Sequence, residues 1–179
     1  IAYSATIPTN SLCVARTYNG SNQQITSATS GTGYKLNGYT QKNAGTHTIT
    51  ATLASGYRWS DNTDGTKTFE CSISKATPTI TLSATNGSVV KGKTLQFNAT
   101  VKSGASTNVA GTLKAVSGTT SVATVSPAST SLTSVDNTNG KVTTETVTGV
   151  SAGESTITVS FTPTDTTNFN SAANKTYKA

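Results

Sequence analysis

Apolar and polar residues alternate along much of this 179-residue chain. The clearest case is residues 46–53, where His47, Ile49 and Leu53 share one face and threonines occupy the other. A strict period of two is typical of a strand with one buried face. Residues 67–74 alternate in the same way, so we predict that the two segments are paired strands.

The rest of the chain predicts shorter strands and no helix. Turn-forming residues separate apolar runs at intervals of about 8–12 residues, the spacing expected of an antiparallel sandwich or barrel. We expect these further strands at residues 2–7, 12–15, 24–27, 34–37, 79–84, 95–101, 113–116, 122–126, 131–135, 142–150 and 155–161. We expect the core to contain Ile49, Leu53, Phe69, Phe97, Val125, Ile157 and Val159.

One phrase occurs twice. Residues 44–50 read Ala-Gly-Thr-His-Thr-Ile-Thr, and residues 152–158 read Ala-Gly-Glu-Ser-Thr-Ile-Thr. The dipeptide Lys-Ala follows each copy, at 75–76 and at 178–179. A phrase that returns at domain-scale spacing indicates a duplicated module.

The repeat divides the chain into two predicted all-β domains, residues 1–76 and 77–179. The joint is short, and Pro78 favours an extended residue before it. The net charge of +6 is shared evenly, +3 in each part, and the basic residues are scattered singly. A nucleic-acid interface needs clustered Lys and Arg, so we expect no nucleic-acid partner and only weak attraction to anionic polymers.

Composition narrows the class further. Charged residues make up 11% of the chain, against roughly 25% in typical globular proteins. The abundance of β-branched residues in alternating patterns still favours a folded protein over a disordered one. No apolar run is long enough to cross a bilayer, so we expect no membrane insertion. The chain starts at Ile1 and contains no Met, which suggests an internal piece of a larger protein with further domains.

Several segments resemble known modules. In the second half the similarity is to bacterial immunoglobulin-like domains of group 2, and in the first half to a related bacterial surface repeat. The segments that carry it are residues 18–20, 38–40, 43–46, 56–61, 121–126, 147–159 and 161–169. The resemblance implies two tandem immunoglobulin-like β-sandwich domains of an extracellular protein on a bacterial cell or a phage particle.

Such modules imply a non-catalytic stalk or spacer that adheres weakly to a cell-surface polysaccharide or to a surface or virion protein. The alternative is an accessory, carbohydrate-binding domain of a secreted or virion-borne hydrolase. We predict no enzyme, because the single histidine, His47, lies on a core-facing strand position and the acidic residues are dispersed. We also expect no cofactor and no metal, because the cysteines and His47 lack ligand spacing and residues 61–65 do not match a calcium-binding loop.

Tyr57, Arg58 and Trp59 form the one candidate ligand-binding site. If their aromatic rings are exposed, they could stack on a sugar or anchor a protein partner; if buried, they would cap the end of a sandwich.

Cys13 and Cys71 are the only cysteines. They lie in segments that are often neighbours in immunoglobulin-like sandwiches, so a disulfide is one interpretation. Two separate buried thiols are the other.

Overall fold

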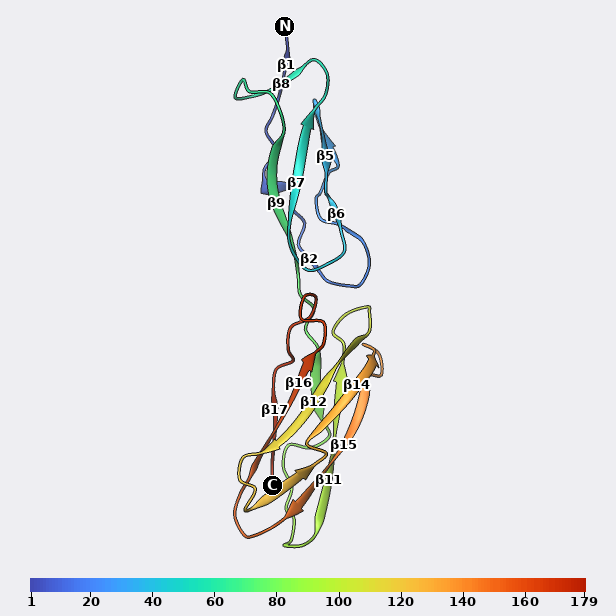
Figure 1. Ribbon diagram of the computed structural model, residues 1–179, viewed down its shortest axis with the longest axis vertical. Coiled ribbons are helices and arrows are strands. Elements are labelled where there is room, and N and C mark those ends of the chain that lie inside the picture. The colour runs from blue at the N-terminus through green and yellow to red at the C-terminus, as the bar shows by residue number, and fades with distance from the viewer. The chain divides into compact units, whose positions relative to one another are not determined.

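The computed structural model describes residues 1–179, and almost all of its regular structure is β-strand (Figure 1). The chain divides into two compact units, Ile1–Lys75 (unit 1) and Ala76–Ala179 (unit 2). The one helical segment is the 3₁₀ turn η1, Asn10–Leu12. No helix has both the length and the apolar character needed to cross a membrane. The predicted all-β class is confirmed.

Unit 1 is built on one five-stranded sheet with two small satellite sheets. The main sheet has the order β2–β9–β7–β5–β4, and the satellites pair β1 with β8 and β3 with β6. The bounds are β1 Tyr3–Ala5, β2 Arg16–Thr17, β3 Gln23–Gln24, β4 Ser30–Gly31, β5 Tyr34–Asn37, β6 Thr40–Gln41, β7 Gly45–Leu53, β8 Tyr57–Trp59 and β9 Lys67–Ser74. The long antiparallel pair β7–β9 is the pair predicted from alternation.

The core of unit 1 contains side chains of the main sheet together with Ala5 and Trp59 of the β1–β8 pair. Ile49 and Phe69 are buried and face each other across β7 and β9, as predicted. Leu53 is only half-buried, so that prediction is wrong. It is the last residue of β7 and pairs with Tyr34 at the end of the ladder, where less of the sheet is covered.

The segment after Pro8 differs from the strand predicted at residues 12–15. It forms η1, capped by Thr9, whose Oγ1 accepts a hydrogen bond from the Ser11 backbone N–H at 3.4 Å. Thr, Asn and Ser readily form such local bonds, and these compete with strand pairing. Only a single bridge, between Cys13 and Thr26, remains of the expected strand.

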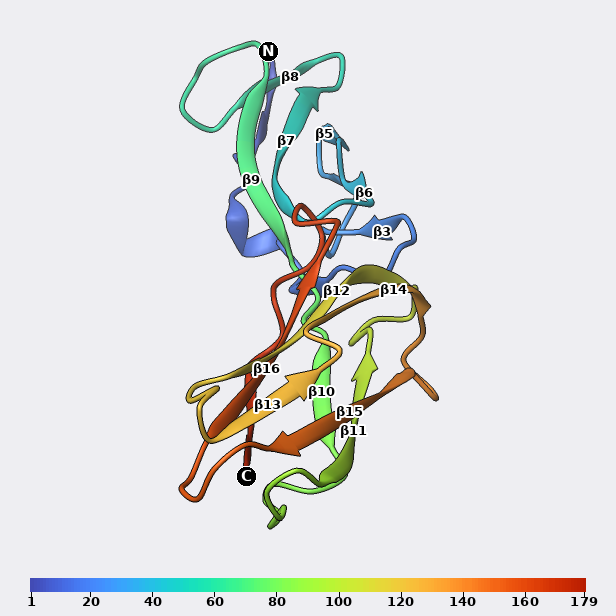
Figure 2. The same cartoon turned by 60° about the horizontal axis from the view of Figure 1, so that its bottom comes forward.

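Unit 2 is a β-sandwich of two four-stranded sheets. One sheet has the order β10–β11–β15–β13, visible in Figure 2, and the other has the order β14–β12–β16–β17. The bounds are β10 Thr79–Leu82, β11 Thr94–Lys102, β12 Val109–Ser117, β13 Ala123–Ser126, β14 Ser129–Val135, β15 Lys141–Gly149, β16 Thr156–Pro163 and β17 Lys175–Lys178. The chain changes sheets between β13 and β14, where the Ser126–Pro127 peptide is cis. The sheets follow the order of an immunoglobulin-like sandwich, A-B-E-D against C-F-G, with β14 as an additional edge strand beside β12.

Both sheets of unit 2 contribute to its core. Phe97 of β11 stacks on Tyr177 of β17, with ring centroids 4.3 Å apart. Phe97, Ile157 and Val159 are buried, as predicted. Val125 is only half-buried, so that prediction is wrong; β13 is an edge strand that pairs with β15 on one side and with no strand on the other.

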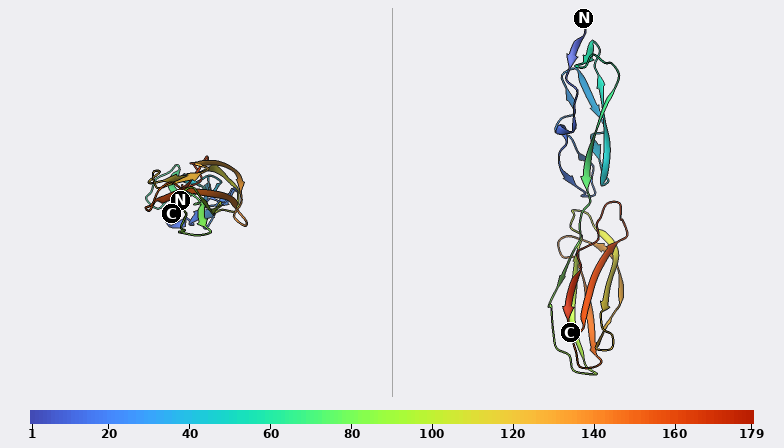
Figure 3. Two further views of the ribbon diagram at one scale, coloured as in Figure 1. Left: turned by 90° about the horizontal axis from the view of Figure 1, so that it is seen from below. Right: turned by 90° about the vertical axis from the view of Figure 1, so that its left-hand side faces the viewer.

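The repeated phrase occupies equivalent places in the two units. It introduces β7 in unit 1 and β16 in unit 2, and each strand pairs antiparallel with the last strand of its unit; the orange and red pair β16–β17 is seen in the right-hand view of Figure 3. The Lys-Ala endings are not equivalent. His47 pairs with Cys71, whereas the matching Ser155 bonds Ala179, so the two endings differ by several residues in register.

Candidate functional site

Trp59 belongs to the core rather than to a ligand surface. Its side chain is only 1% exposed, and its Nε1–H donates to the Gly65 carbonyl oxygen at 2.8 Å. The indole ring lies 5.7 Å from the ring of Tyr34. The hypothesis that Trp59 contacts a ligand is therefore wrong, and the capping alternative describes this residue.

The other two residues of the predicted site point in opposite directions. Tyr57 is half-buried, with its ring centroid 5.5 Å from that of Tyr3, which is 69% exposed. Arg58 faces the other way and forms an exposed ion pair with Asp64 at 3.3 Å. Alternation along β8 places Arg58 on the face opposite to Tyr57 and Trp59, and Trp59 is buried, so the three side chains do not form one binding surface.

The two cysteines are joined by a disulfide. The bridge spans 58 residues of sequence, with the two Cα atoms 5.4 Å apart. It connects the segment after η1 to the middle of β9, and neither cysteine is free. The structure therefore agrees with the disulfide interpretation and not with two separate buried thiols.

His47 and the acidic loop have structural partners. His47 is half-buried opposite Cys71, and its Nε2 lies 2.8 Å from the Asn43 carbonyl oxygen. Asp61 accepts hydrogen bonds from Lys67 and Thr63, which lower its pKa to about 2. No group of three or more His, Cys, Asp or Glu side chains is placed to hold a metal ion.

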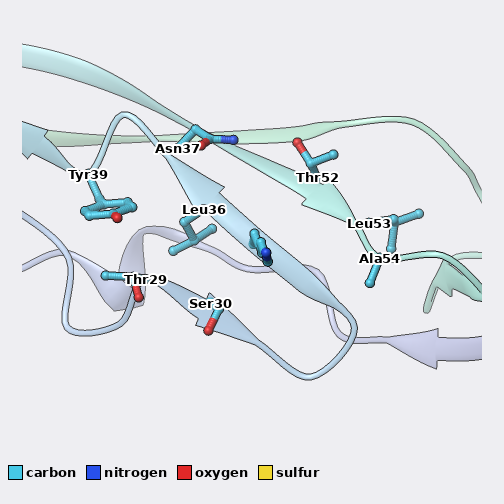
Figure 4. Close-up of a pocket in the computed structure, with 9 residues that line it drawn as sticks. Thr29, Ser30, Leu36, Asn37, Tyr39, Thr52, Leu53 and Ala54 are labelled. Carbon is cyan, nitrogen blue, oxygen red and sulfur yellow. The ribbon is translucent and has the colours of Figure 1, made fainter.

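A groove in unit 1 brings together residues that the sequence analysis did not connect. It is an open groove of about 650 Å³ over β4, β5 and the end of β7 (Figure 4). Its lining consists of Thr29, Ser30, Lys35, Leu36, Asn37, Tyr39, Thr52, Leu53 and Ala54. Tyr39 lies at one end of the groove, and Leu53 and Ala54 lie at the other.

Strand register positions the polar side of this groove. Ser30 pairs with Lys35, and Lys35 pairs with Thr52, so these three residues form one row across β4, β5 and β7. Asn37 follows Lys35 by two residues and therefore projects from the same face. Sequence analysis predicted the segments that became β5 and β7 but not their pairing, which is what creates the row.

The polar side chains of the groove have no hydrogen-bond partners within the protein. This holds for the Lys35 ammonium, the Asn37 amide and the hydroxyls of Thr29, Ser30 and Thr52, whereas Gln41 nearby donates to the Gly38 carbonyl oxygen at 2.9 Å. No carboxylate lines the groove. The groove is thus a hollow with one cation, one amide, several hydroxyls and a small apolar area.

No protein-family model matches the chain, and no curated protein matches it in sequence. Among solved structures, domains 4 and 5 of the S-layer protein SbsC are similar at 21% identity and a TM-score of 0.40, with 92% of each chain covered. The D00-D0 domain of intimin matches at 14% identity and a TM-score of 0.35, over 91% of this chain and 95% of that one. The fibronectin(III)-like modules of Clostridium thermocellum CbhA match at 12% identity and a TM-score of 0.36, over 93% of this chain and 88% of that one. The likeness concerns the fold alone.

Proposed function

We propose that this chain is a non-catalytic spacer of a larger bacterial or phage surface protein, with weak affinity for cell-surface polysaccharide. The observation that carries the proposal is the surface chemistry of the sandwich sheets. On the outer face of unit 2, neutral polar side chains bond one another, Thr144 to Asn98 at 2.9 Å and Gln96 to Thr146 at 3.2 Å. Such a face tolerates permanent exposure to water without an apolar patch that would aggregate.

The disulfide supports an extracellular location. Disulfides persist in oxidising compartments and are rare in the cytosol. The Cys13–Cys71 disulfide links the segment after η1 to β9 of the main sheet, so it is part of the folded structure of unit 1. A spacer displayed outside a cell or on a virion would keep it oxidised.

The alternative role is a carbohydrate-binding accessory domain of a hydrolase. The groove of unit 1 favours it, because its size lies within the range of small-ligand sites. The two roles differ in their neighbours: a spacer is expected to sit among further modules, and an accessory domain beside a catalytic one.

The test is sedimentation of the purified chain with isolated bacterial cell walls, together with an assay for new reducing ends. The proposal predicts saturable, weak retention that soluble wall polysaccharide reverses, and no release of reducing ends. Release of reducing ends that scales with the concentration of the chain would contradict the non-catalytic role. Absence of retention at millimolar concentration on walls from several species would contradict adhesion and leave a spacer alone.

A further inference from the structure

We propose that the groove over β4, β5 and β7 binds an anionic sugar residue of a polysaccharide, with Lys35 as the group that recognises the negative charge. This inference rests on the proposed weak affinity for polysaccharide and assigns it a site and a ligand class. The anion can be a carboxylate or a phosphate, because a lysine ammonium acts as a point charge toward either.

The charge of Lys35 is left uncompensated by the protein. Two other basic side chains of unit 1 form ion pairs, Lys67 with Asp61 at 2.7 Å and Arg58 with Asp64 at 3.3 Å. Lys35 forms no ion pair, and no acidic residue lines the groove around it. The groove therefore attracts an anion and has no group that repels one.

The rest of the lining suits a sugar ring. Asn37 offers an amide donor and acceptor, and Ser30 and Thr52 offer hydroxyls that can do both. The half-buried Tyr39 adds apolar area, against which the C–H face of a pyranose can pack. A ligand with many hydroxyls, one charge and an apolar face matches this set.

The site is placed on paired strands rather than on a loose loop. Lys35 and Thr52 are held by the β5–β7 ladder, which continues from Tyr34–Leu53 to Asn37–Thr50. On its other side β7 pairs with β9, which carries the disulfide. The strand backbones therefore keep their spacing when a ligand binds, and the long Lys35 side chain is the main group that has to be ordered.

The experiment is an NMR titration of the ¹⁵N-labelled full chain. The three probes are a galacturonate tetramer, glucose 6-phosphate and neutral cellotetraose. We expect amide shifts confined to residues 29–39 and 52–54, with the two anionic probes binding in the high-micromolar to millimolar range and binding weakening as salt is raised. The stronger of the two anionic probes identifies whether carboxylate or phosphate is preferred.

The variants separate charge from shape. Lys35→Ala is expected to weaken binding of the anionic probes about tenfold, the size of one charge-assisted hydrogen bond. Lys35→Arg is expected to restore most of it. Lys42→Ala, which removes an exposed lysine of the same unit outside the groove, is the matched control and is expected to leave binding unchanged.

Asn37→Ala is a second variant, expected to weaken binding while leaving its salt dependence intact.

Three results would overturn the inference: shifts that map elsewhere, equal binding of cellotetraose, or Lys35→Ala binding like wild type. If cell walls still retain the Lys35→Ala chain at wild-type strength, the groove is not the site, although the proposed function stands. If the walls never retain the wild type, the proposed affinity itself fails.

Discussion

The two units use different means to stabilise an all-β fold. Unit 1, Ile1–Lys75, is the smaller; four of its strands are two residues long, and a disulfide crosses its core. Unit 2 contains two four-stranded sheets, has no cysteine, and packs Phe97, Phe161 and Tyr177 between them. A small domain buries a smaller fraction of its surface, so a crosslink compensates for the apolar contacts that it lacks. The contrast teaches that an all-β domain can be stabilised by a covalent bond or by a larger core.

The largest expected effect tests the core of unit 2. Ile157 is fully buried on β16, so Ile157→Ala should lower the free energy of unfolding of unit 2 by about 2–5 kcal/mol and leave unit 1 unchanged. Denaturant unfolding measures this. Val116→Ala, which truncates a side chain that is 56% exposed, is the control and should change little. A similar loss in both variants would show that the burial of Ile157 is not what stabilises the unit.

An intermediate effect tests the aromatic end of unit 1. Gly33 has a φ of +83°, and a β-carbon there would collide with the ring of Tyr57. Gly56 has a φ of +82° but open space around it. Both Ala variants suffer the backbone strain, about 1–2 kcal/mol, and only Gly33→Ala also displaces Tyr57. Thermal melts should therefore rank Gly33→Ala below Gly56→Ala; equal melting temperatures would mean that the ring moves without cost.

The smallest expected effect is a pH dependence of the stability of unit 2 that is caused by one buried acidic residue. Glu145 of β15 is 1% exposed among apolar residues, its Oε2 has no hydrogen-bond partner, and burial raises its pKa. It lies opposite Phe97, and the other buried titratable side chain of unit 2 is Tyr177, whose pKa is also raised by burial. No charged group compensates Glu145 in this core.

The sign follows from linkage. Below about pH 4.3 the Glu145 carboxyl is protonated in both the folded and the unfolded chain. Its ionisation then takes nothing from the free energy of unfolding of unit 2. As pH rises toward the higher folded pKa, the unfolded chain loses the proton first, so stability falls. Glu145→Gln should remove this decline in a pH series of urea melts. The exposed Glu154→Gln should not, and a decline that persists in Glu145→Gln would assign it to other groups.

The long strands could be predicted from the sequence, but features that depend on contacts between distant segments could not. Alternation in residues 46–53 and 67–74 is a local signal, and both became long strands with only small changes of boundary. Residues 175–178 were not predicted as a strand, because Tyr177 is the one apolar residue turned inward there. The burial of Trp59 and the groove around Lys35 arise from pairing between segments, which no local pattern records.

The most direct test of the contrast is calorimetry of the intact chain with and without a thiol reductant. The bridge closes a span of 58 residues, and removing it should destabilise unit 1 by about 2–4 kcal/mol. For a domain of this size that corresponds to a drop in melting temperature of about 10 °C or more. We predict two transitions, of which only one moves when reductant is added, and a Cys13→Ser/Cys71→Ser chain that shows the lowered transition in either buffer. A reductant shift of both transitions, or of neither, would contradict the account.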